Sequence, residues 1–126
     1  MKRNLILMMV VAVIFSCTKD PSKPSVGLNN KISAATTTVS MITTTSARCG
    51  GTATSGGADS IIARGVCWGT VNNPTINNSK TSDGTGSGVY VSVITGLTTN
   101  KQYYVRAYVV STERVAYGET RIFKTL

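Results

Sequence analysis

Short strand-like runs separated by turn residues fill the chain from about Lys31 to its end, and this pattern constrains the fold most. The expected strands are 39–44, 46–54, 60–69, 88–95, 102–111 and 120–126. The segments between them are rich in Gly and Asn, and outside the N-terminal run no segment keeps helical periodicity for three turns. Antiparallel strands at this spacing are typical of a β-sandwich or barrel, so the chain is expected to be all-β.

The first sixteen residues have the organisation of a secretory signal peptide. A basic start, Met1–Asn4, precedes an apolar run at 5–15. This run is shorter than the roughly 20 residues that a membrane-spanning helix needs. Ile14-Phe15-Ser16-Cys17 resembles the lipobox of bacterial lipoproteins. That resemblance implies cleavage after residue 16 and acylation of Cys17, which then becomes the first residue.

A short polar segment follows the expected anchor. Residues 21–25 read Pro-Ser-Lys-Pro-Ser, a composition typical of an extended tether. The residue after Cys17 is Thr18 and does not resemble an inner-membrane retention signal, which favours the outer membrane, at its periplasmic face or at the cell surface. We therefore expect a signal peptide at 1–16, a lipid-anchored Cys and tether at 17–33, and one domain at 34–126.

The segment Gly96–Tyr108 resembles the corner and following strand of a fibronectin type III domain. In that family a Leu stands six residues before a Tyr whose hydroxyl closes the corner, and here these residues are Leu97 and Tyr103. The wider pattern is similar to fibronectin type III-like modules of bacterial surface lipoproteins, through 63–68, 73–76, 79–81, 83–84 and 116–123. The resemblance implies an antiparallel, immunoglobulin-like sandwich of about seven strands.

Alternate side chains on a strand face opposite sides, so one inward residue assigns its neighbours. With Tyr103 inward, the expected core residues on the same strand are Val105, Ala107 and Val109. On the preceding strand they are Tyr90, Ser92 and Ile94. The last strand is ambiguous, because an inward Phe123 also turns Arg121 inward. A bulge or an edge position would resolve that conflict, and the sequence does not choose between them.

The residue inventory argues against catalysis. The chain contains no His, which is the commonest general base and metal ligand. Its five acidic residues are scattered, and no two form an obvious catalytic pair. The glycine-rich segment 83–88 lacks the signature of a phosphate or calcium loop and is interpreted as a hairpin turn. No enzyme activity, metal or cofactor is expected. The net charge is +8, but no basic cluster with interleaved aromatics predicts nucleic-acid binding.

Two cysteines remain besides Cys17. Cys49 and Cys67 fall on the second and third expected strands of the domain, and both face inward if Gly65 and Cys67 point to the core. In an oxidising envelope a disulfide between them is the natural hypothesis. The alternative is two buried, reduced thiols that pack as small apolar residues.

An outward face is the candidate binding site. With the same assignment, Arg64, Val66 and Trp68 share a face with three residues of the neighbouring strand: Tyr104, Arg106 and Tyr108. Aromatic rings beside guanidinium groups can stack on sugar rings or anchor a protein partner. Ordinary cross-strand pairing is the alternative. The expected function is a non-catalytic, lipid-anchored envelope module for adhesion, spacing or protein interaction, or alternatively carbohydrate binding through this face.

Overall fold

The computed structural model describes residues 31–57 and 59–126, which form eight β-strands. The strands are β1 (Ile32–Thr36), β2 (Ala47–Ser55), β3 (Ile61–Gly69), β4 (Ser79–Lys80), β5 (Gly88–Ile94), β6 (Gln102–Ser111), β7 (Val115–Tyr117) and β8 (Arg121–Lys124). Among these residues no helix is long and apolar enough to cross a bilayer. The predicted signal peptide, Cys17 and the tether up to residue 30 lie outside the described residues.

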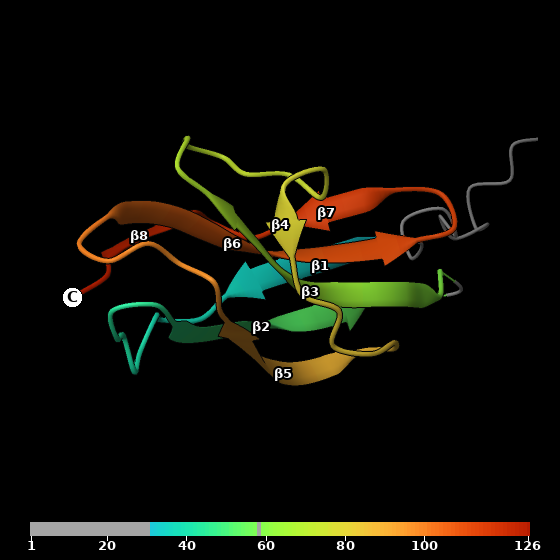
Figure 1. Cartoon of the computed structure of the whole chain (residues 1–126). Helices are drawn as coiled ribbons and strands as arrows, with labels where there is room; N and C mark the ends of the chain where they lie inside the picture. Colours follow the sequence, from blue (N-terminus) through green and yellow to red (C-terminus); the bar gives the residue numbers. More distant parts are fainter. Residues whose placement is uncertain (1–30, 58) are drawn as a thin grey trace, which may run out of the picture.

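The strands form two antiparallel sheets packed face to face. One sheet has the order β1-β2-β5, and the other has the order β4-β3-β6-β7 with β8 also paired to β6. Figure 1 shows β7 and β8 along β6, toward its opposite ends. This arrangement confirms the predicted all-β antiparallel sandwich.

The expected strand at 39–44 is wrong. That segment is an irregular connection with one isolated bridge, between Ser40 and Arg48. Met41 adopts a positive φ of 48°, which breaks an extended conformation. The Thr43 hydroxyl accepts a hydrogen bond from the Ser46 backbone N–H at 2.9 Å, forming a side-chain turn in place of a sheet ladder.

The first strand was not predicted. β1 begins at Ile32, which lies within the range 17–33 assigned to the tether, so the sandwich starts two residues before residue 34. Ile32 is buried in the core, which explains why the chain is ordered into a strand there. The short strands β4 and β7 were also not predicted, because two or three residues carry too little alternation to be recognised.

The core lies between the sheets and follows the predicted alternation on two strands. Every residue expected inward on β6 and β5 is buried: Tyr103, Val105, Ala107, Val109, Tyr90, Ser92 and Ile94. Phe123 of β8 is also buried, and its ring stacks on Tyr103 with centroids 5.7 Å apart. These predictions are confirmed.

An edge position resolves the conflict over Arg121. The last strand is broken between β7 and β8, and Arg121 stands at the first position of β8. Its guanidinium donates to the Thr36 backbone oxygen of β1 at 3.2 Å and lies 3.6 Å from the Glu119 carboxylate. The side chain stays 42% exposed at the border of the core, although its Nε is buried without a hydrogen-bond partner among the described residues.

Candidate functional site

The corner before β6 is built as the fibronectin resemblance implied. Leu97 and Tyr103 are both buried, and the Tyr103 hydroxyl accepts a hydrogen bond from the Thr98 backbone N–H at 2.8 Å. That donated bond favours the ionised phenol, so it lowers the pKa of Tyr103. The corner therefore fixes the start of β6 and with it the face on which each β6 side chain lies.

The predicted orientation of β3 is wrong. A β-bulge between Ile61 and Ala63 shifts the register, and beyond it Val66 pairs with Ala107 of β6. Val66 packs inside the core, and Trp68, two residues on, packs partly against the core. Because a bulge inserts one extra residue, the alternation after it is inverted. Trp68 therefore does not share an outer face with the β6 tyrosines.

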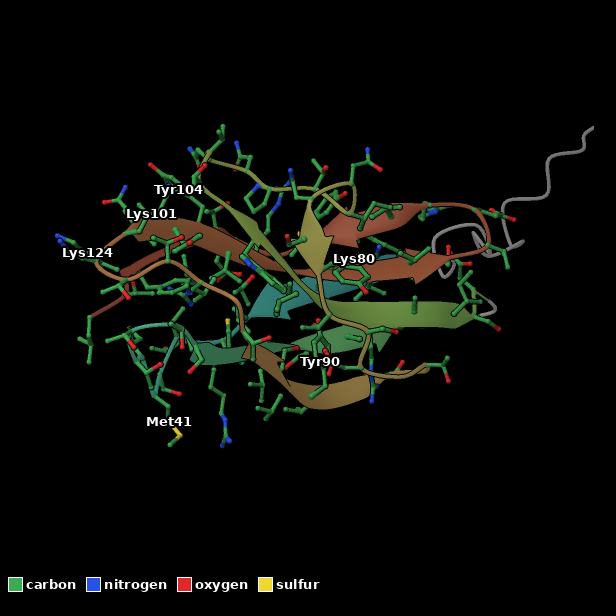
Figure 2. The ribbon with its side chains drawn as sticks, in the orientation of Figure 1. Met41, Lys80, Tyr90, Lys101, Tyr104 and Lys124 are labelled. Carbon is green, nitrogen blue, oxygen red and sulfur yellow. The ribbon has the colours of Figure 1, made fainter. Side chains whose placement is uncertain are left out.

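Arg64 is also absent from that face. Its guanidinium lies over the ring of Tyr90, 5.3 Å from the centroid, and Figure 2 shows Tyr90 between β3 and β5. The same side chain donates to the backbone oxygens of Asp83 and Gly86, both at 2.9 Å. These bonds hold the 83–88 segment against the sandwich, so the role of Arg64 here is structural.

Tyr108 faces outward from β6 but is buried, with only 1% of its surface exposed. Its hydroxyl donates to the backbone oxygen of Thr81, which lies in the segment that follows β4. That segment approaches closely because Gly65, the β3 residue paired with Tyr108, carries no side chain to exclude it. Tyr108 was expected to be accessible, and this expectation is wrong.

Two of the three outward-facing β6 residues, Arg106 and Tyr104, stay partly exposed. Arg106 donates to the Pro74 backbone oxygen at 2.7 Å and stacks on the Tyr117 ring, 3.9 Å from its centroid. Tyr104, which is labelled in Figure 2, remains half-buried. Its hydroxyl lies 3.2 Å from the Gln102 side-chain nitrogen. The five predicted residues therefore form no common face, because the alternation of β3 is inverted and the segment after β4 covers Tyr108.

The two cysteines of the domain are free thiols. Cys49 lies in the core, and its Sγ donates to the Thr37 backbone oxygen at 3.5 Å. Cys67 lies outside the core cluster, with its Sγ directed at the Pro74 backbone oxygen of the covering loop, also at 3.5 Å. The predicted disulfide is therefore wrong, because the β3 bulge turns Cys67 to the opposite side of the sheet.

We expect neither thiol to react with an aromatic disulfide reagent at pH 8 while the domain is folded. Burial raises the pKa of Cys67 to about 11 and also raises the pKa of Cys49. The reactive form is the thiolate, and at pH 8 a pKa of 11 leaves about one thiolate per thousand. The reaction should accelerate as the pH approaches 11, and full denaturation should release both thiols. Failure to recover them in denaturant without a reductant would contradict this assignment.

A hollow lies beside Trp68. It has a volume of about 490 Å³ and is bordered by the β3–β4 loop on one side and by Gly96 and Leu97 on the other. Trp68 and Tyr103 contribute aromatic surface, and the loop contributes three amides, from Asn72, Asn73 and Asn78. In the sequence these asparagines indicated only turns, because nothing local shows that the loop folds beside Trp68.

An apolar face was also missed. Val89, Val91 and Val93 of β5 are 72%, 60% and 53% exposed and point away from the core. β5 is an edge strand of its sheet, and its seven residues include no charge. We call these three residues the valine face. The alternation along 88–95 was the signal for it, but only the inward half of that alternation was used.

The described residues contain no group of three or more His, Cys, Asp or Glu side chains placed to hold a metal ion.

The chain resembles solved structures in its fold. No family model and no curated protein sequence matches it. It is similar to a fibronectin type III domain of the human KIAA0970 protein, with a TM-score of 0.53 and 14% identity, over 89% of this chain and 87% of that chain. It is also similar to the sensor domain of the anti-sigma factor RsgI4 of Pseudobacteroides cellulosolvens, with a TM-score of 0.52 and 20% identity, over 75% of this chain and 94% of that one. These likenesses establish a fibronectin type III-like sandwich.

Proposed function

We propose that this chain is a non-catalytic, lipid-anchored envelope module that binds a protein partner through the valine face. Attachment at Cys17 and placement at the outer membrane follow from the lipobox resemblance and the signal-like N-terminus. Acyl chains bind bilayers with about 0.8 kcal/mol per buried methylene, so two or three chains anchor a protein stably. A tethered sandwich with an adhesive face then acts as an interaction module.

The valine face carries this proposal. Three large apolar side chains in a row on one edge strand form a contiguous exposed patch, which marks an interaction site more often than scattered apolar residues do. Natural edge strands are usually shortened or charged to prevent pairing with other chains. At the other sheet edges, β4, β7 and β8 have two, three and four residues and β1 has five, whereas β5 has seven and lacks a charge.

A cation at the border of the face indicates the chemistry of the partner. Arg48 of β2 pairs with Val93, is exposed, and forms no ion pair with the described residues. Next to it Gly50 pairs with Val91 and adds no side chain to this border. The partner is therefore an envelope protein that presents an apolar strand with an acidic residue opposite Arg48.

Photocross-linking from position 91 tests this function. A benzophenone amino acid replaces Val91 in the full chain within the native envelope, and we expect one cross-linked partner protein. The matched control is the same probe at Thr54, which is exposed on β2 beyond the part that pairs with β5. Arg48→Glu should lower the yield at position 91 several-fold. Cys17→Ser should move the chain out of the membrane fraction and abolish the product.

Equal products from positions 91 and 54, or none from either, would contradict the proposed face. A product of twice the chain's own mass would replace the envelope protein with a second copy of the chain.

Carbohydrate binding is the second candidate function. The aromatic face predicted for it does not assemble, but Trp68 lines the hollow beside the asparagine loop, and that observation favours a different sugar site.

A further inference from the structure

The hollow beside Trp68 has the size and wall of a small-ligand site. Its volume of about 490 Å³ falls within the roughly 300–1,000 Å³ of small-molecule pockets. No residue of the valine face lines it, so a ligand bound there is independent of the proposed protein partner. The side chains of its wall indicate the chemistry of that ligand.

Trp68 provides an apolar surface that is held in place. The side chain is half-buried, packs against the core cluster and also borders the hollow. A ring fixed in this way offers contact area without losing rotamer freedom on binding. The electron-rich face of an indole attracts the C–H groups on the apolar face of a sugar ring, which carry partial positive charge.

The asparagine amides present donors. The Asn72 Oδ1 accepts the Asn73 backbone N–H at 2.8 Å, and the Asn78 Oδ1 accepts the Thr75 backbone N–H at 2.8 Å. A backbone N–H is only a donor, so each bond fixes which end of the amide is oxygen. The Asn73 Oδ1 lies 3.0 Å from the Thr120 hydroxyl. All three oxygens have partners, and the Nδ2 groups have none among the described residues.

A wall of amide donors selects a ligand rich in acceptors. Hydroxyl and ring oxygens of a saccharide can accept from the Nδ2 groups, and saccharide hydroxyls can also donate to the second lone pair of an amide oxygen. None of the residues that line the hollow is charged, so nothing there compensates a phosphate or a carboxylate. The chemistry favours a neutral sugar.

The loop that forms the wall is fixed before any ligand arrives. Arg106 holds the Pro74 backbone oxygen, and the Tyr117 hydroxyl accepts the Ile76 backbone N–H at 3.1 Å. Asn73 adopts a positive φ of 59°, a conformation that Asn tolerates better than most residues. Pre-organisation of this kind reduces the entropy lost on binding.

We propose that the hollow binds one unit of a neutral oligosaccharide, with a sugar ring on Trp68 and its oxygens accepting from Asn72, Asn73 and Asn78. This site differs from the outward face predicted from the sequence, because its donors come from a loop and not from β6.

Intrinsic fluorescence provides a direct test, because Trp68 is the only tryptophan in the chain. The probes are cellohexaose, maltohexaose, xylohexaose and mannohexaose, with oligogalacturonate as the acidic comparison, each at physiological salt. We expect a saturable fluorescence change with at least one neutral oligosaccharide, with the affinity unchanged when the salt is raised.

Asn→Asp variants locate the binding. Asn72→Asp and Asn78→Asp keep the oxygen that holds the loop and remove the amide donors, and each should weaken binding at least about tenfold, which corresponds to about 1.4 kcal/mol. The matched control is Asn77→Asp, which introduces the same charge into the same loop at an exposed residue outside the hollow. Its affinity should stay unchanged, as should that of Val91→Lys.

Three results would overturn this site. The first is no saturable change with any neutral oligosaccharide up to roughly 10 mM, where even a Kd of about 1 mM gives near saturation. The second is equal weakening by Asn77→Asp and Asn78→Asp, or no weakening by Asn78→Asp. The third is binding of oligogalacturonate alone, lost on adding salt. None of them bears on cross-linking at Val91, so the two proposals fail separately.

Discussion

Replacing Tyr108 with Ala is expected to lower the free energy of unfolding by about 3–5 kcal/mol, the usual loss for a large buried aromatic. The ring is buried between β6 and the segment after β4, and only 1% of the residue is exposed. The change also removes the hydroxyl that donates to the Thr81 backbone oxygen. That oxygen then loses a partner in a site from which water is largely excluded.

The matched control is Tyr104→Ala, which removes the same side chain from the same face of the same strand. Tyr104 is half-buried and its hydroxyl has only an exposed side-chain partner, so we expect a loss of about 1 kcal/mol. Denaturant unfolding monitored by Trp68 fluorescence measures both variants. If Tyr104→Ala and Tyr108→Ala lower the free energy of unfolding equally, the segment after β4 does not cover Tyr108.

Replacing Tyr103 with Phe removes one oxygen atom and should lower the free energy of unfolding by about 1–3 kcal/mol. The Thr98 backbone N–H donates to the Tyr103 hydroxyl, and without it this donor at the corner is left unpaired. The ring itself remains and keeps its stacking on Phe123. In a domain of this size, each 1 kcal/mol lowers Tm by about 4–8 °C, so thermal unfolding resolves the change.

Tyr104→Phe is the control for this second variant. It removes a hydroxyl one residue away, where the partner is the exposed Gln102 side chain, and we expect a change within about 0.5 kcal/mol. If Tyr103→Phe unfolds at the same temperature as Tyr104→Phe, the corner hydrogen bond does not contribute to stability.

Local patterns in the sequence were sufficient to predict the fold class, the corner and the faces of two strands. The bond between Thr98 and Tyr103 joins residues only five apart, so one short motif contains both partners. On β6 and β5 the predicted inward residues alternate without interruption. Period-two alternation over seven to ten residues assigns a face without any knowledge of the neighbouring strands.

The face of β3 could not be predicted in this way. Its sequence, Ile-Ile-Ala-Arg-Gly-Val-Cys-Trp-Gly, has apolar residues on both sides, and the bulge near Ile62 inverts the alternation. An unbroken alternation from the buried Ile61 would turn Cys67 inward, whereas the structure turns Val66 inward. The one residue inserted at the bulge is therefore the reason why both the predicted disulfide and the predicted binding face are wrong.

The candidate sites depended on contacts between distant segments. The Tyr108 hydroxyl meets a carbonyl 27 residues away, and the Arg106 guanidinium meets one 32 residues away. Through these contacts the segment after β4 covers Tyr108, and the loop around Pro74 lies against Arg106. The same folding of the loop brings its asparagines beside Trp68 and creates the hollow.

Spacing within a few residues was enough to establish the all-β class, the tyrosine corner and the strands with regular alternation, because each of these is a local property of the chain. Three properties needed the folded molecule: which side of β3 is buried, the separation of the two thiols, and the position of the accessible surfaces. Exposure depends on what packs over a strand, and here the covering loop and the β-bulge override the local pattern.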